Sequence, residues 1–165
     1  MKKKIAWFPT IVLMIIIFYF SNQPADVSSD LSGGISYQIV EFTVSMIDEA
    51  YNNKEILSLA ERIDYPVRKL AHLTEYALLG MAITFGILYG SNVDKLNQKR
   101  QYVFVQGIGS FYAMTDEIHQ LFVPGRAGRM SDVLIDSIGI MFGFGIFIYF
   151  FNRIKKLPCF NCIEH

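Results

Sequence analysis

The stretch VLIDSIGIMFGFGIFIYFF, residues 133–151, carries a single charged side chain, that of Asp136. Crossing a hydrocarbon core of about 30 Å takes roughly 20 helical residues at about 1.5 Å each. This stretch is therefore long and apolar enough to span a membrane as one helix. The rest of the chain supports that class, because 52% of its 165 residues are hydrophobic and only 18% are charged.

Three further apolar blocks precede it, at residues 5–20, 67–90 and 102–123. The last two of these contain charged side chains, which should face the interior of a helix bundle because exposing each to lipid costs on the order of 3 kcal/mol. The sequence thus predicts an all-α membrane protein with four spans in a single domain, residues 1–165. The first block has an alternative interpretation as a signal peptide, but SNQP at residues 21–24 makes a poor cleavage site and an uncleaved anchor is favoured.

The distribution of charge predicts the orientation of the spans. With the amino terminus inside, the cytoplasmic segments hold nine of the fifteen Lys and Arg residues but only two of the fifteen acidic residues. We therefore expect both termini in the cytoplasm, including a tail at residues 152–165. The Cys159-x-x-Cys162 pair and His165 in this tail give a weak zinc or thiol signal, and incidental residues are the favoured interpretation.

The segment between the first two spans, residues 21–66, is too long for a simple turn. Apolar residues at helical spacing over residues 35–47, followed by residues 54–63, predict one or two amphipathic helices on the outer surface. A mobile acidic loop is the alternative, because Gly33-Gly34 interrupts the pattern. Pro66 is expected at the first position of the second span. Three residues are candidate caps for the first surface helix: Ser28, Ser29 and Asp30.

Polar side chains gather where the second span begins, the third ends and the fourth begins. Helices that alternate in direction bring these three ends to one level, on the outer side, and Pro124-Gly125 is expected to break the third helix there. The candidate ligand-binding residues at this level are Lys69, His72, Tyr76, Asp116, Glu117, His119, Gln120, Arg126, Arg129, Asp132 and Asp136.

This polar cluster admits three interpretations. The first is purely structural: four cations and five carboxylates form a nearly balanced network of ion pairs and hydrogen bonds. The second is a divalent metal site on His72-x-x-Glu75 and Asp116-Glu117-x-His119, which is not favoured because the nearby cations already neutralise the carboxylates, so no cofactor is expected.

The third interpretation is capture of an anion by the guanidinium groups of Arg126 and Arg129 in the Pro/Gly turn. A lipid phosphate at the outer surface would suit such a site, and His72, Glu117 and His119 are the candidates for acid–base catalysis on it. The sequence has no nucleophile elbow, phosphate-binding loop or zinc-protease motif, so hydrolysis rests on residue types alone. No nucleic-acid partner is expected.

With these residues placed, the chain resembles the VanZ-like family of bacterial membrane proteins over nearly its whole length. Ser137 is the one departure, since relatives carry other polar residues nearby. The resemblance rests on four motifs: Phe20-Ser21-x-Gln23-Pro24, Lys69-x-x-His72-x-x-x-Tyr76, Asp116-Glu117-x-His119-Gln120-x-Phe122-x-Pro124-Gly125-Arg126, and Asp132-x-x-x-Asp136-x-x-Gly139.

The resemblance implies a protein of the plasma membrane and cell envelope linked to reduced susceptibility to glycopeptide antibiotics, teicoplanin in particular. It implies no reaction. The expected function is an outward-facing polar pocket that binds a membrane lipid, the headgroup of a lipid-linked wall precursor, or the antibiotic itself. Two alternatives remain: an intramembrane hydrolase or transferase acting on a phosphate-bearing lipid, and a structural ion-pair network in a partner-binding membrane protein.

Overall fold

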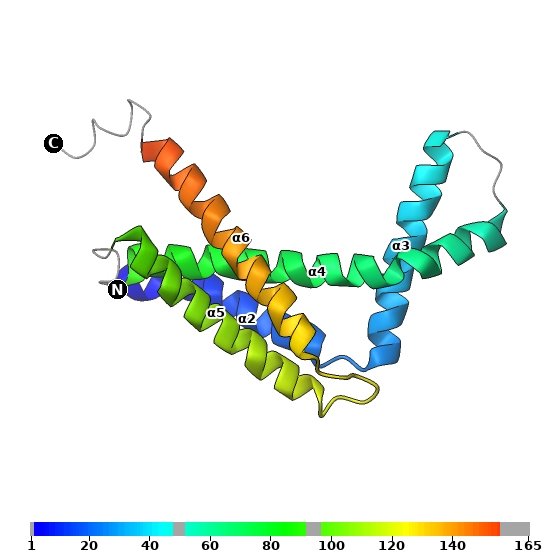
Figure 1. Ribbon diagram of the computed structural model, residues 1–165, viewed down its shortest axis with the longest axis horizontal. Coiled ribbons are helices and arrows are strands. Elements are labelled where there is room, and N and C mark those ends of the chain that lie inside the picture. Colours follow the sequence, from blue (N-terminus) through cyan, green and yellow to red (C-terminus); the bar gives the residue numbers. More distant parts are fainter. Residues whose placement is uncertain (1, 48–51, 92–96, 156–165) are drawn as a thin grey trace.

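The computed structural model describes residues 2–47, 52–91 and 97–155. This part of the chain is helical and contains no strand, which confirms the all-α class. Its helices, labelled in Figure 1, are α1 (Lys2–Ile5), α2 (Phe8–Ser21), α3 (Ala25–Ile47), α4 (Asn53–Gly90), α5 (Gln98–Gln120) and α6 (Met130–Lys155).

The longest helix, α4, runs for 38 residues through the middle of the molecule. Asn52 caps it: its side chain accepts hydrogen bonds from the backbone N–H groups of Lys54 and Glu55, and Glu55 returns one to the Asn52 N–H. The expectation that the chain restarts at Pro66 is wrong, because Pro66 lies inside α4. A proline removes one helical hydrogen bond, and here the turns on either side of it continue the helix regardless.

Helix α6 crosses α4 near the middle of both helices (Figure 1). Glycines allow their backbones to touch: a Cβ added at Gly139 would lie 2.6 Å from the Leu73 carbonyl oxygen, and one added at Gly80 would lie 2.5 Å from that of Ile140. A Cβ at Gly143 would overlap the backbone of Ala77. Gly139 and Gly143 are four residues apart, the spacing that lets membrane helices approach closely.

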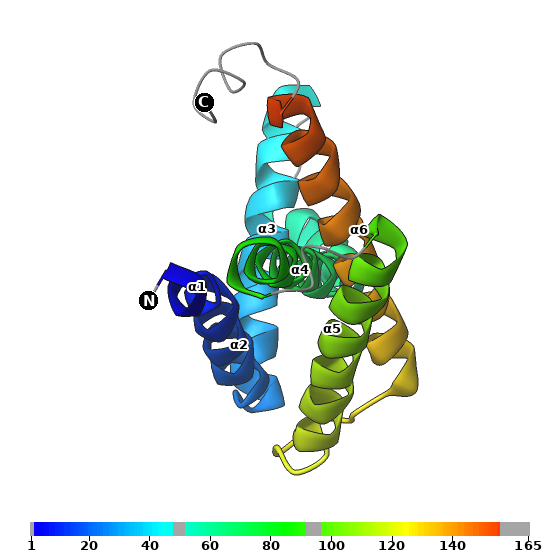
Figure 2. The ribbon, with the colours of Figure 1, turned by 90° about the vertical axis from the view of Figure 1, so that its left-hand side faces the viewer.

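The remaining helices pack on the two sides of α4. Figure 2, which looks nearly along α4, shows α1 and α2 on one side and α5 and α6 on the other. Between them lies an apolar core in which several side chains are fully buried. Its fully or almost fully buried members are Tyr76, Leu79, Ile83, Ile87, Val105, Ala113 and Ile140.

Helix α3 crosses the amino-terminal third of α4, at the end away from the chain termini (Figure 1). It begins at Ala25 and continues through Gly33 and Gly34, so the proposed caps at Ser28, Ser29 and Asp30 and the loop alternative are wrong. Val40 packs on Ile56 and Ala60 of α4 in a small second core. The opposite face of α3 exposes large apolar side chains at helical spacing: Val27, Leu31, Ile35, Ile39, Phe42 and Met46.

Three segments are long and apolar enough to cross a membrane: Lys3–Ser21, Asn53–Gly90 and Met130–Lys155. They contain the first, second and fourth of the four spans expected from the sequence. Helix α5, which contains most of the third, does not qualify by composition among the described residues. The structure therefore supports a membrane protein with three candidate spans.

Candidate functional site

The turn between α5 and α6 gathers the polar ends of three helices. Helix α5 ends at Gln120, and Gly125 adopts a positive φ of 74°, a conformation that glycine reaches without strain. Helix α6 then begins at Met130, so Asp132 and Asp136 lie on its first two turns. The break expected at Pro124-Gly125 is confirmed, and it folds α6 back beside α5.

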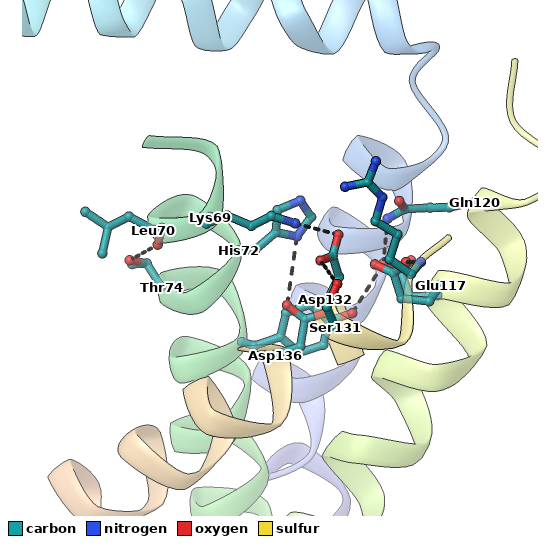
Figure 3. A network of polar contacts seen from close by, with 12 residues as sticks. Lys69, Leu70, His72, Thr74, Glu117, Gln120, Ser131, Asp132 and Asp136 are labelled. Atoms are coloured by element: carbon teal, nitrogen blue, oxygen red, sulfur yellow. Dashed lines mark hydrogen bonds and ion pairs between the residues drawn. The ribbon is translucent and has the colours of Figure 1, made fainter. Parts of the chain in front are cut away.

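Two contacts join α4 to the start of α6 (Figure 3). The Lys69 Nζ lies 2.6 Å from Asp132 Oδ2, in an ion pair whose side chains are 17% and 14% exposed. One helical turn further into the bundle, His72 Nδ1 lies 4.0 Å from Asp136 Oδ1. The two pairs are stacked, because residues 69 and 72 share one face of α4 and residues 132 and 136 share one face of α6.

Helix α5 contributes two carboxylates to the same region. Asp116 Oδ2 accepts hydrogen bonds from the hydroxyl of Tyr76 at 3.3 Å and from the side-chain amide of Gln120 at 3.4 Å. Glu117 Oε2 accepts one from the backbone N–H of Arg129 at 2.8 Å, which fixes the turn to α5. These contacts orient one oxygen of each carboxylate.

The other carboxylate oxygens are buried without hydrogen-bond partners among the described residues. This applies to Asp116 Oδ1, to Glu117 Oε1 and to both oxygens of Asp136, which is completely buried. His72 Nδ1 is also buried without a hydrogen-bond partner in this part of the chain. Leaving a charged group buried and unpaired costs several kcal/mol. Of the balanced network that is one interpretation of the sequence, the described residues form two close ion pairs, Lys69–Asp132 and Arg68–Asp64, and the second of these uses an acid outside the five candidate carboxylates.

Arg126 makes a different set of contacts from those expected of it. Its Nε donates to the Gln23 carbonyl at 3.1 Å and its Nη2 to the Phe20 carbonyl at 3.2 Å, which ties the turn to the end of α2. The backbone supports the same junction, because the N–H of Ala25 donates to the Pro124 carbonyl. Among the described residues no carboxylate lies within ion-pair distance of Arg126. Burial lowers its pKa, and the neighbouring charge of Arg68 lowers it further.

Arg68 lies across from Arg126 on α4. Its Nη2 donates to Asp64 Oδ2 at 2.8 Å and to the hydroxyl groups of Ser29 and Ser32 on α3, at 3.3 and 3.2 Å. The Asp64 carboxylate is itself fixed by the hydroxyl of Ser36 at 3.4 Å. The serine face of α3 therefore packs on the charged face of α4.

A pocket of about 370 Å³ opens between these elements. Small-molecule sites are typically roughly 300–1,000 Å³. Its polar wall includes Arg68, His72, Glu75, Asp116 and Arg126, which come from α4, α5 and the turn. Its apolar wall comes from α2 and α3 and includes Ile17, Phe20, Val27, Leu31 and Ile35.

The structure brings eight of the eleven sequence candidates together in the cluster and places three elsewhere. Arg126 lines the pocket but bonds to α2. The ring of His119 stacks on Phe18 at 4.6 Å, and its Nε2 lies 3.2 Å from Asn22 Oδ1, so it faces α2. The side chain of Arg129 is exposed, and only its backbone contacts the cluster.

A metal site has no geometric support in the described residues, where no group of three or more His, Cys, Asp or Glu side chains is arranged to hold an ion. Cys159, Cys162 and His165 lie outside the described residues. The residues that could contact a ligand are therefore those of the pocket wall.

Sequence reasoning missed the contribution of α2 and α3 to this site. Gln23 and Phe20 bind Arg126 through backbone carbonyls, which no side-chain pattern reveals. Ser29 and Ser32 had a usable signal, because they recur at helical spacing with Ser36 and so mark the face of α3 that packs on α4.

Comparison with known proteins gives one finding. The model of a family described as VanZ/LLP1 matches residues 6–152, which is most of the chain and includes every residue of the pocket. Searches of curated proteins and of solved structures gave no match.

Proposed function

Because this chain belongs to the VanZ/LLP1 family, we propose that it is a four-span protein of the bacterial plasma membrane whose outer pocket binds the headgroup of a membrane lipid or lipid-linked wall precursor. This binding reduces susceptibility to teicoplanin and related glycopeptides, which act on wall precursors outside the membrane. The antibiotic itself is the other candidate occupant of the pocket.

The distribution of side chains on α5 supports a fourth span. At 23 residues it is about 35 Å long, enough to cross a hydrocarbon core of about 30 Å. Four of its polar side chains are buried, those of Gln101, Asp116, Glu117 and Gln120, and the exposed charged ones, Lys99 and Arg100, lie at its first turn. Its outer face exposes Val103, Phe104, Phe111, Met114 and Ile118. Mean hydropathy underrates such a helix because it counts inward and outward residues alike.

The charge distribution supports the orientation. Four spans with both termini cytoplasmic place the nine basic residues of the end segments and the α4–α5 connection inside, in agreement with the positive-inside rule. The pocket, the α5–α6 turn and α3 then lie on the outer side. The exposed apolar side chains of α3 are those of an amphipathic helix resting on the outer membrane surface.

The arrangement of Arg126 carries the proposal. Its guanidinium lines the pocket, two backbone carbonyls hold it in position, and no carboxylate among the described residues neutralises it. A cation that is held in place and unpaired is ready to bind an anion with little loss of conformational entropy. The apolar wall beside it suits an amphiphile better than a free anion.

Native mass spectrometry of the protein extracted from its own membrane tests the proposal. The parent should retain a phosphate-bearing lipid, and Arg126→Gln should release it. Arg129→Gln is the matched control, because this arginine lies three residues away with its side chain exposed. A parent without bound lipid, or an Arg126→Gln variant that keeps it, would overturn the proposal.

A second candidate function is an intramembrane enzyme acting on a phosphate-bearing lipid. One observation favours it: His72 lines the pocket, and its Nδ1 faces the buried carboxylate of Asp136 at 4.0 Å. In that role His72 moves a proton at the phosphate, and Asp136 is the carboxyl group that faces its ring. Release of phosphate from a labelled lipid by the purified parent, and its loss in His72→Gln, would establish turnover and replace simple binding. The third candidate, a structural network in a partner-binding protein, is supported by the Lys69–Asp132 pair and by the contacts of Arg68 with Asp64, Ser29 and Ser32.

A further inference from the structure

The pocket has two walls of opposite charge. Arg126 and Arg68 supply the positive side: Arg68 is paired with Asp64, and Arg126 has no ion-pair partner among the described residues, so Arg126 is the cation open to an anion. Glu75 and Asp116 supply the negative side. An occupant with phosphate alone would leave Glu75 and Asp116 without a positively charged partner. An occupant with amine alone would leave Arg126 without an anion, since among the described residues Arg68 has an ion-pair partner and Arg126 has none.

The two acids of the negative side are free to accept a donor. Asp116 is 3% exposed; Tyr76 and Gln120 both donate to its Oδ2, and its Oδ1 accepts no hydrogen bond from the described part of the chain. Glu75 is half-buried in the pocket wall, and it makes no hydrogen bond and no ion pair among the described residues. Unpaired carboxylates that line a pocket favour a ligand with a positively charged donor.

The third feature is the apolar rim formed by α3. Val27, Leu31 and Ile35 line the pocket and are also 48%, 60% and 48% exposed, so the apolar surface continues from the pocket to the outside of the molecule. An acyl chain attached to the occupant can follow that surface into the surrounding lipid. A ligand that is wholly water-soluble would have no use for it.

We propose that the pocket binds a phospholipid whose headgroup carries both a phosphate and a primary amine, with Arg126 and Arg68 on the phosphate and Glu75 and Asp116 on the amine. This inference rests on the proposed headgroup-binding function and names the headgroup. The acyl chains leave along Val27, Leu31 and Ile35. The charge on both sides of the pocket then has a partner.

Lipid binding by the purified full chain tests this, with phosphatidylethanolamine, phosphatidylglycerol and phosphatidic acid of identical acyl chains measured by native mass spectrometry. The parent should bind phosphatidylethanolamine tightest. Glu75→Gln should weaken that binding about tenfold, which corresponds to one lost charge-assisted hydrogen bond, and should leave phosphatidic acid within about twofold. Retained phosphatidic acid binding also shows that the variant is folded.

Two matched variants complete the test. Glu61→Gln removes an exposed acid on the same helix outside the pocket, and it should leave binding of all three lipids unchanged. Arg126→Gln should weaken all three, since each carries phosphate. Soluble glycerophosphoethanolamine should not displace the lipid, because it lacks the acyl chains that contact α3; displacement at equal concentration would overturn the lipid as the source of the headgroup.

The outcomes separate this inference from the function on which it rests. Equal binding of the three lipids by the parent, or equal loss of all three in Glu75→Gln, would overturn the amine-bearing headgroup and leave phosphate binding standing. A parent that binds none of them would overturn both.

Discussion

Asp136 faces His72 across the α4–α6 interface, with Oδ1 and Nδ1 4.0 Å apart, and no lysine or arginine lies within ion-pair distance of the Asp136 carboxylate among the described residues. This differs from an arrangement in which Asp136 balances Arg126 or Arg129. The difference decides what Asp136→Asn does, because that substitution breaks no ion pair with a lysine or arginine.

Asp136→Asn should therefore leave the thermal stability of the purified protein unchanged or raise it. The variant replaces a completely buried carboxyl group that makes no hydrogen bond and no close ion pair among the described residues, so no such contact is lost. Thermal unfolding in one detergent, compared with the parent, measures the effect. A fall of several kcal/mol would show that the carboxylate is paired with a cation and would contradict the geometry.

The Lys69–Asp132 pair predicts the opposite result for its neighbour. Asp132→Asn should destabilise the protein by up to about 3 kcal/mol, because it leaves a largely buried ammonium group without its partner. The double variant Lys69→Met with Asp132→Asn should recover much of that loss, since it removes both charges. Additive losses in the four-variant cycle would mean that the two side chains do not interact.

The glycines at the α4–α6 crossing predict a strong position dependence. Gly143→Ala should destabilise the protein by roughly 1–3 kcal/mol, because its Cβ would overlap the backbone of Ala77. Gly145→Ala, two residues away on the same helix, meets nothing within 4 Å and should be neutral or slightly stabilising, as alanine favours helix over glycine. Equal unfolding temperatures for the two variants would argue against this helix contact.

Ser137 joins α6 to α5 through a small polar contact. Its hydroxyl lies 2.9 Å from that of Ser110, and Gln106 donates both to Ser110 and to the Ser137 carbonyl, each at 3.0 Å. Ser137→Ala should cost only about 0.6–1 kcal/mol, the usual range for such bonds between membrane helices. Lipid retention should stay at the parent level. A loss of bound lipid would mean that this contact positions the pocket.

The proposed topology predicts which sites a membrane-impermeant thiol reagent reaches on intact cells. Glu41→Cys on α3 should be labelled and Gln98→Cys at the start of α5 should not, each in a chain whose native cysteines are replaced by serine. Both side chains are exposed on the protein surface, so burial within the protein would not explain a difference in labelling. Permeabilised cells provide the control, where both should react. The reverse pattern on intact cells would place the pocket on the cytoplasmic side.

The sequence predicts helices well in this chain because the apolar blocks are long and uninterrupted. It also predicts the break at Pro124-Gly125, since proline and glycine act locally. It fails at Pro66 and at Gly33-Gly34, where local preference favours an end and packing of α3 against α4 maintains the helix. Propensity is a weak guide wherever tertiary contacts are extensive.

The side chains of the site are predicted unevenly for a similar reason. Lys69 and Asp132 are both predicted as site residues and they form an ion pair, although Lys69 lies inside α4 and not at the helix end that the sequence predicts. The role of Arg126 does not follow, because its partners are the backbone carbonyls of Phe20 and Gln23, and any residue type supplies those. His119 faces α2 instead of the cluster because of the rotation of α5 about its axis, and the sequence of α5 does not determine that rotation.

Because α4 continues unbroken through Pro66, its amino-terminal part extends beyond the expected span as one rigid helix. Residues 53–66 lengthen the helix by about 20 Å beyond the part expected to cross the membrane, at about 1.5 Å per residue. On the proposed topology this helical extension lies between the bilayer and the cell wall. Helix α3 contacts α4 through hydrogen bonds of Ser29 with Arg68 and of Ser36 with Asp64. Lys69 directly follows Arg68 on α4, and His72 lies about one helical turn further along. A displacement of the outer end of α4 by wall material or by a second protein would therefore be transmitted along one helix to His72 in the pocket wall.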